Sequence, residues 1–131
     1  MSKQVYLTGY TGKKPADLKA MVERMNARLI DIRYSPNSRV PQWRQPALVE
    51  LLGDAYYHII SFGNVAYKEK RIQIYNFDAG ESWLFWHFQD HPEQPVILMC
   101  ACKDATTCHR TEVGNRLKEC GYSVSELSEW K

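Results

Sequence analysis

Three cysteines lie close together in the last third of the chain and are followed at once by a histidine and an arginine: Cys100, Cys102, Cys108, His109 and Arg110. A thiolate can act as a nucleophile, a redox group or a metal ligand, and the pKa of the thiol decides how much thiolate is present. A neighbouring arginine or protonated histidine lowers that pKa. These residue types therefore predict thiol chemistry, although they do not specify the reaction.

A strand, a turn and a helix are expected to position these groups. The apolar run at 96–99 predicts a buried strand, and a polar turn at 103–106 follows it. Apolar residues then recur at helical spacing, at Val113, Leu117 and Cys120. The sequence therefore predicts a strand that leads through a short turn into an amphipathic helix.

Cys108 is the leading candidate nucleophile, with Cys100 second. We expect Thr106 or Thr107 to cap the helix, which places Cys108 at or in its first turn and Cys100 at the carboxyl end of the strand. In open α/β sheets ligands bind at this junction, and the helix dipole there favours a thiolate. The alternative is that both cysteines are buried packing residues, because a free cysteine packs like a small hydrophobic group.

The spacing C-x-C-x5-C-H also raises the question of zinc, which takes four such ligands. Structural zinc sites usually pair a C-x2-4-C knuckle with a second, separate pair. His109 directly follows Cys108, and we expect the two side chains to diverge on the helix. The sequence therefore predicts no metal and no cofactor, and a zinc-stabilised module stays the third reading.

Strands and helices alternate along the whole chain. Strands are expected at 4–8, 29–33, 56–60 and 96–99, with a last edge strand at 122–127. Helices are expected from Pro15 along the face 18–25, at 46–52, at 78–90 after an Asp78–Glu81 capping box, and after Thr106. The pattern predicts one α/β domain over 1–131, a three-layer sandwich with a mainly parallel central sheet and helices on both faces.

Two segments do not follow this alternation. Residues 34–45 are rich in turn-forming residues and predict a long loop. A loop of this length is either functional or mobile. Residues 65–77 are ambiguous, because Ile72 and Ile74 alternate as in a strand but follow a run of basic residues. The helix at 78–90 is apolar on nearly every side, and we expect it to lie in the core rather than at a dimer interface.

Several basic residues are candidates for binding an anion. Asp31 and Arg33 are two apart on one strand, so they share a face, where Asp31 can orient Arg33 toward a phosphate or carboxylate. Arg39 and Arg44 lie in the long loop, together with Trp43, which could stack on a ring. The alternatives are a structural ion pair and a solvated loop with one anchoring aromatic residue.

Composition excludes several classes of protein. The chain has 131 residues and a net charge of +2, which is too small for bulk nucleic-acid binding. No stretch is apolar enough to span a bilayer, and the N-terminus runs straight into a strand-like segment, so we expect no signal peptide. Four cysteines without a secretory signal favour a reducing, cytoplasmic location over a disulfide framework.

The chain resembles domain-of-unknown-function family 488. Matching pieces occur over nearly the whole length: Gly9-Tyr10-Thr11, Asp31-Ile32-Arg33 with Pro36 and Ser38-Arg39, Tyr57-His58, Phe62-Gly63-Asn64, Leu98-Met99-Cys100-Ala101, Lys103-Asp104 and Cys108-His109-Arg110. Two positions depart from the family pattern, since Tyr10 stands where many relatives have histidine and Cys102 where many have glutamate. Each departure would remove a polar group from a family mechanism.

The resemblance implies an α/β sandwich and no established activity. It also implies one pocket at the carboxyl edge of the sheet, where Asp31, Arg33, Cys100, Cys108, His109 and Arg110 should meet. Gly9, Tyr10 and Arg39 would border that pocket.

The leading functional hypothesis is a pocket for a small anionic ligand, of the nucleotide or phosphorylated-sugar class. Arg33, Arg39 and Arg110 would hold the anion, and Cys108 or Cys100 would serve as nucleophile, with Asp31 and His109 assisting. The alternative is a module that binds nucleic acid or a protein through Trp43, Arg44, Lys68, Lys70 and Arg71, with structural cysteines. Whether the protein is an enzyme, and its oligomeric state, stay open.

Overall fold

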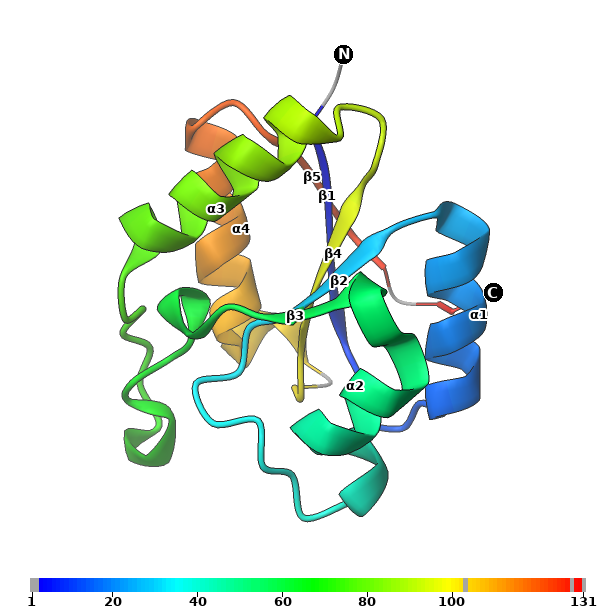
Figure 1. Cartoon of the computed structure of the whole chain (residues 1–131). Coiled ribbons are helices and arrows are strands. Elements are labelled where there is room, and N and C mark those ends of the chain that lie inside the picture. The colour runs from blue at the N-terminus through cyan, green and yellow to red at the C-terminus, as the bar shows by residue number, and fades with distance from the viewer. Residues whose placement is uncertain (1–2, 103, 128, 131) are drawn as a thin grey trace.

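The computed structural model describes residues 3–102, 104–127 and 129–130. Within these residues one sheet of parallel strands runs through the molecule in the order β3-β2-β4-β1-β5 (Figure 1). The strands are β1 (Gln4–Gly9), β2 (Arg28–Asp31), β3 (Tyr56–His58), β4 (Val96–Cys100) and β5 (Ser123–Glu126). The predicted parallel sheet is confirmed, including the edge position of the last strand.

Four helices in the described residues cover the two faces of this sheet. They are α1 (Pro15–Met25), α2 (Gln45–Leu52), α3 (Phe77–Asp90) and α4 (His109–Glu119). Figure 1 shows α1 and α2 on one side of the strands and α3 and α4 on the other. The protein is therefore an α/β sandwich of three layers, as predicted. No helix in the described part of the chain is both long and apolar enough to cross a membrane.

The central strand β4 is buried on both faces. Ile97 and Met99 pack into the core on the side of α1 and α2, whereas Val96, Leu98 and Cys100 pack into the core on the side of α3 and α4. A strand in this position reads as a continuous apolar run, because neither face meets water. The core contacts also fix the direction of Cys100, which points toward α4.

Helix α3 buries one face rather than its whole circumference. Leu84 and Phe88 are buried, but Phe85 is 39% exposed and Trp86 is 64% exposed. The expectation that this aromatic helix lies in the core is thus correct for one face only. The periodicity did not show this, because aromatic residues occupy both sides of the helix.

Two predicted helix caps are wrong, for the same kind of reason. Asn76, not Asp78, caps α3 by accepting a hydrogen bond from the Ala79 N–H at 3.2 Å. Cys108 is the N-cap of α4, and its side chain makes no capping bond. Several residues near each helix start are able to cap it, and the path of the preceding segment decides which one occupies the first non-helical position.

The threonines expected to cap α4 lie in a separate 3-10 turn, Ala105–Thr107. Asp104 caps that turn, since its carboxylate accepts bonds from the backbone N–H and the hydroxyl of Thr106 at 2.9 and 2.7 Å. The extra turn delays the start of α4 to His109. Cys108 therefore precedes the helix instead of lying inside its first turn.

The ambiguous segment 65–77 is a loop held by Asn64. The Asn64 side chain accepts bonds from the Ala66 and Gln73 N–H groups, at 3.0 and 2.8 Å, and donates to the Arg71 carbonyl at 2.9 Å. The strand-like feature of this segment, within the described residues, is an isolated antiparallel bridge between Asn64 and Ile74. The loop presents its basic residues at the carboxyl edge of the sheet.

Candidate functional site: a thiol cluster beside a basic pocket

The ends of the three middle strands create an opening in the fold. Gly9 at the end of β1 is in register with Cys100 at the end of β4, and Asp31 at the end of β2 is in register with Met99. Strand β1 continues to α1 on one face, whereas β4 continues to α4 on the other (Figure 1). Where neighbouring strands lead to opposite faces, the connections separate and leave a crevice outside the strand ends.

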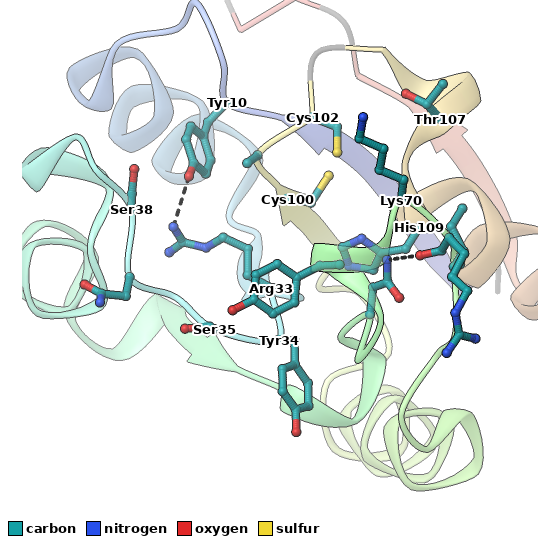
Figure 2. Close-up of a pocket in the computed structure, with 16 residues that line it drawn as sticks. Tyr10, Arg33, Tyr34, Ser35, Ser38, Lys70, Cys100, Cys102, Thr107 and His109 are labelled. Carbon is teal, nitrogen blue, oxygen red and sulfur yellow. Dashed lines mark hydrogen bonds between the residues drawn. The ribbon is translucent and has the colours of Figure 1, made fainter.

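A pocket of about 810 Å³ occupies this edge (Figure 2). Its volume lies within the range of small-molecule sites, which is roughly 300–1,000 Å³. Its walls come from the strand ends, the 34–38 segment, the Asn64 loop and the start of α4. Its lining includes aromatic, basic and thiol side chains: Tyr10, Arg33, Tyr34, Tyr67, Lys70, Arg71, Cys100, Cys102 and His109.

The three clustered thiols meet at the floor of this pocket. The sulfur atoms of Cys100, Cys102 and Cys108 all lie within 4.8 Å of one another, and the Cys100 and Cys108 sulfurs are 2.7 Å apart. Cys100 and Cys108 are each 1% exposed, whereas Cys102 is half-buried and lines the pocket. Cys102 is thus the thiol that a ligand can reach most easily.

Cys102 was the weakest of the three sequence candidates, yet it has the best position for chemistry. Cys108, the predicted nucleophile, lies behind it and does not line the pocket, while Cys100 contributes to the lining from the strand end. One sequence signal could have identified Cys102. Residues two apart on an extended chain share a face, so Cys102 follows Cys100 toward the same site.

The three thiols of the cluster differ in how readily they lose a proton. Hydrogen bonds from the thiols of Cys100 and Cys108 lower the pKa of Cys102 far below its ordinary value, and the charge of Arg110 adds to the effect. Hydrogen bonds with Cys102 and Cys108, together with burial, raise the pKa of Cys100. For Cys108 the bond with Cys100 acts to lower the pKa, but the bond with Cys102 and burial outweigh it. The cluster therefore favours ionisation of Cys102 over ionisation of Cys100 or Cys108.

Arg110 fixes the cluster from the side away from the pocket. Its Nη1 lies 3.2 Å from the Cys100 sulfur and 2.6 Å from the Cys102 carbonyl oxygen, while Nε and Nη2 donate to the Glu126 carboxylate at 2.9 and 2.7 Å. The side chain is 2% exposed and does not line the large pocket. Its position therefore suits it to hold the thiols rather than the predicted anion.

Gly9 makes the close approach of these groups possible. A Cβ atom built on Gly9 would lie 1.7 Å from the Cys102 carbonyl oxygen and 2.8 Å from the Arg110 Nη1. Real atoms do not approach this closely, so only glycine fits without moving the backbone. Gly9 thus lies against the Cys102 segment through its backbone but does not line the large pocket, so its place at the pocket border stays a prediction of the resemblance.

His109 lies beside Cys108 rather than diverging from it. Its Nδ1 is 4.0 Å from the Cys108 sulfur, and its Nε2 donates to the Ile32 carbonyl oxygen at 2.8 Å. The expected divergence is wrong because Cys108 precedes the helix. Burial lowers the pKa of His109, so the ring is neutral near pH 7. Since Nε2 carries the proton, Nδ1 has a free lone pair toward Cys108.

Asp31 and Arg33 form a buried ion pair. Arg33 donates to Asp31 from Nε at 2.9 Å and from Nη2 at 2.6 Å, and its Nη1 donates to the Tyr10 hydroxyl at 3.1 Å (Figure 2). The Tyr56 hydroxyl donates to the second Asp31 oxygen at 2.6 Å. Arg33 lies just beyond the end of β2, and its side chain contacts that of Asp31 directly, as their spacing of two residues predicts.

The charges of this pair set the pKa values around it. Burial acts to lower the pKa of Arg33, but the hydrogen bond and charge of Asp31 outweigh burial and raise it. Burial and the Asp31 carboxylate together raise the pKa of Tyr56, which stays a hydrogen-bond donor at all physiological pH values. The arrangement holds the Arg33 guanidinium in one orientation at the pocket wall.

The predicted ring-stacking residue is not accessible. Trp43 is 3% exposed and stacks on Tyr10, with ring centroids 4.5 Å apart and planes 15° apart. Arg44 donates to the Ser38 carbonyl oxygen at 2.8 Å. The 34–45 loop is therefore pinned to the core by Trp43, and neither residue lines the pocket.

Two further sequence candidates have positions that limit their roles. Arg39 is exposed and does not line the pocket. His58 donates from Nε2 to the Arg33 carbonyl oxygen at 2.7 Å, which makes it a hydrogen-bonded structural group. Lys103, part of the motif at the end of β4, lies outside the described residues.

The three thiols are also the described side chains best placed to hold a thiophilic metal ion. Zinc–sulfur bonds of about 2.3 Å with tetrahedral angles hold two sulfurs about 3.8 Å apart. The Cys100 and Cys108 sulfurs, at 2.7 Å, are about 1 Å too close for that geometry. A metal would therefore have to push these two buried side chains apart.

Comparison with known proteins adds no family assignment. No protein-family model, curated protein or solved structure matches this chain.

Proposed function

We propose that the pocket binds a small anionic ligand of the nucleotide or phosphorylated-sugar class. The observation that supports this proposal is the gathering of Arg33, Lys70 and Arg71 around one cavity of ligand size. The resemblance to domain-of-unknown-function family 488 stays a prediction beside it.

The three cations have different roles in the proposal. Arg33 is neutralised by Asp31, so it offers oriented N–H donors rather than net charge. Arg71 pairs with Glu69 at 3.3 Å, but both side chains are more than half exposed, so this pair is weak and an incoming phosphate can replace it. Lys70 adds a further positive charge at the pocket wall.

Aromatic residues at the same pocket favour a ligand that carries a ring: Tyr34 and Tyr67 line the pocket, and Tyr75 lies against Tyr34 outside it. The Tyr34 ring lies 6.3 Å from the Tyr67 ring and 5.8 Å from the Tyr75 ring, centroid to centroid. Tyr67 is 49% exposed and Tyr75 is 56% exposed. Exposed aromatic faces stack on bases, with a free energy of about 1–3 kcal/mol per base. We therefore rank a nucleotide above a sugar phosphate.

The test is a calorimetric titration with AMP, adenosine, ribose 5-phosphate and inorganic phosphate. AMP is expected to bind more tightly than adenosine, because the phosphate meets the basic residues, and more tightly than inorganic phosphate, because the base stacks. The double variant Lys70→Gln, Arg71→Gln should weaken AMP binding about tenfold or more, since a hydrogen bond to a charged group is worth about 1.5–3 kcal/mol.

Lys118→Gln is the matched control, because Lys118 is exposed in the last turn of α4 and does not line the pocket. It removes one positive charge without touching the site. Equal weakening by this control, or no binding of any of the four compounds, would contradict the proposal.

The alternative is a module that binds nucleic acid or a protein. The buried position of Trp43 removes one of its expected contacts, but Lys68, Lys70 and Arg71 stay grouped on one loop. A titration with a single-stranded oligonucleotide distinguishes this alternative from the anion-binding pocket. Binding that falls steeply with salt, is absent for AMP and survives Cys100→Ser with Cys108→Ser would favour this alternative.

A further inference from the structure

We propose that the pocket is also the entrance to a three-thiol relay, in which Cys102 reduces a small hydroperoxide and Cys108 and Cys100 take up the oxidation as a buried disulfide. This inference goes beyond anion binding and does not depend on it. It rests on three sulfurs within 4.8 Å of one another, one reachable from the pocket and two buried behind it.

The arrangement separates the roles that thiol oxidation needs. A peroxide-reducing thiol has to be ionised and accessible, and the resolving thiol has to lie within reach of it. Figure 2 shows the Cys102 and Cys100 sulfurs together beside the pocket, and Cys102 has the lowered pKa of the three. Cys108 lies behind them with a neutral histidine nitrogen 4.0 Å from its sulfur.

In the first step the Cys102 thiolate attacks one oxygen of the hydroperoxide. A sulfur–oxygen bond forms, the oxygen–oxygen bond breaks, and the distal oxygen leaves as hydroxide or alkoxide. Cys102 becomes a sulfenic acid, and the peroxide is reduced by two electrons.

In the second step the Cys108 sulfur attacks the Cys102 sulfur. The His109 Nδ1 accepts the proton of the Cys108 thiol and returns it to the leaving hydroxide, so that water is released. A disulfide between Cys102 and Cys108 forms. The geometry supports this role of His109, because its other nitrogen is fixed to the Ile32 carbonyl.

In the third step Cys100 exchanges with Cys102. The hydroxide or alkoxide from the first step takes up the Cys100 proton, and the guanidinium of Arg110, 3.2 Å from this sulfur, stabilises the thiolate. Cys100 attacks the Cys108 sulfur, and Cys102 leaves as thiolate. Exchange in this direction is favoured, because the thiol of lower pKa is the better leaving group.

The short distance between the two buried sulfurs favours this product over a metal site. A disulfide bond is about 2.05 Å long. The Cys100 and Cys108 sulfurs have to move about 0.7 Å closer to form one, whereas a zinc site would need them about 1 Å further apart.

The experiment treats the reduced protein at pH 7 with one equivalent of hydrogen peroxide, blocks the remaining thiols with N-ethylmaleimide and maps the products by peptide mass spectrometry. The expected product is a disulfide between Cys100 and Cys108, with Cys102 and Cys120 alkylated. Cys102→Ser should slow peroxide consumption at least tenfold, and Cys108→Ser should leave a Cys102 sulfenic acid that dimedone traps.

Cys120→Ser is the matched control, since Cys120 is an exposed cysteine outside the cluster, and it should behave as the unchanged protein does. Equal peroxide consumption by the Cys102→Ser variant would overturn the proposal. So would oxidation of Cys120 ahead of the cluster, or a stoichiometric metal on protein purified without chelator that blocks the reaction. If a variant with a changed buried cysteine fails to fold, the disulfide and alkylation sites mapped in the unchanged protein still test the proposal.

Discussion

At the scale of single residues, Asp31 is the group on which the pocket wall depends most. It is fully buried and accepts hydrogen bonds from the Arg33 guanidinium and the Tyr56 hydroxyl. A buried carboxylate is stable only with such partners, and each partner in turn needs it. Because Arg33 also donates to Tyr10, the loss of one carboxylate disturbs three side chains around the cavity.

Asp31→Asn is expected to lower the free energy of unfolding by about 3 kcal/mol or more, because it leaves Arg33 as an unpaired buried charge. Urea unfolding followed by circular dichroism measures this. Asp54→Asn, at an exposed aspartate, should change the free energy by less than about 0.5 kcal/mol. A loss at Asp31 no larger than that at Asp54 would show that the ion pair does not stabilise the fold.

At the scale of elements, the end of β1 is fitted against the segment that follows β4. The Tyr10 N–H donates to the Cys100 carbonyl oxygen at 3.0 Å, which extends the pairing of the two strands beyond Gly9. The Cys102 carbonyl then turns onto the Gly9 Cα and is held there by Arg110. The position of the Cys102 thiol thus depends on two strand ends being in register.

Gly9→Ala is expected to destabilise the protein by about 1–3 kcal/mol and to raise the apparent pKa of Cys102, because the added methyl group pushes the Cys102 segment away. Urea unfolding and the pH dependence of Cys102 alkylation report the two effects. Gly12→Ala is the comparison, since its Cβ meets nothing within 4 Å and only its backbone angle, φ +84°, opposes alanine. If Gly12→Ala changed Cys102 reactivity as much, the close contact at Gly9 would not be the cause.

At the scale of the whole molecule, the two helices on one face of the sheet each contribute a buried neutral histidine. His87 in α3 is 5% exposed and His109 in α4 is 8% exposed. Burial is the largest cause that lowers the pKa of both, below the ordinary value of about 6.5. The unfolded chain therefore binds more protons than the folded protein once the pH falls through this value.

Stability is therefore expected to be level above about pH 7.5 and to fall as the pH drops from about 6.5 toward 5.5. The slope has a limit of about 1.4 kcal/mol per pH unit for each histidine. Urea unfolding at several pH values measures it. His109→Gln should reduce the slope, because it removes one of the two buried histidines. A flat profile in the unchanged protein would be inconsistent with neutral buried histidines.

The sequence by itself determined the order and type of most elements and the presence of a thiol-rich strand end. The apolar run of β4 follows from burial on both faces of the sheet, and the helical spacing in α1 follows from burial of one helix face. The meeting of Asp31, Arg33 and Cys100 at one edge was an expectation from the family resemblance rather than from this periodicity.

The tertiary structure alone decided which group could act on a ligand. Whether Cys102 or Cys108 faces the cavity depends on the extra turn before α4 and on the contact between Gly9 and Cys102, neither of which leaves a local pattern. The packing of Trp43 on Tyr10 likewise removed a residue that its loop position had suggested was exposed. The exposure of a side chain and the pKa of a thiol depend on distances between residues far apart in sequence. The spacing of residues along the chain does not predict those distances.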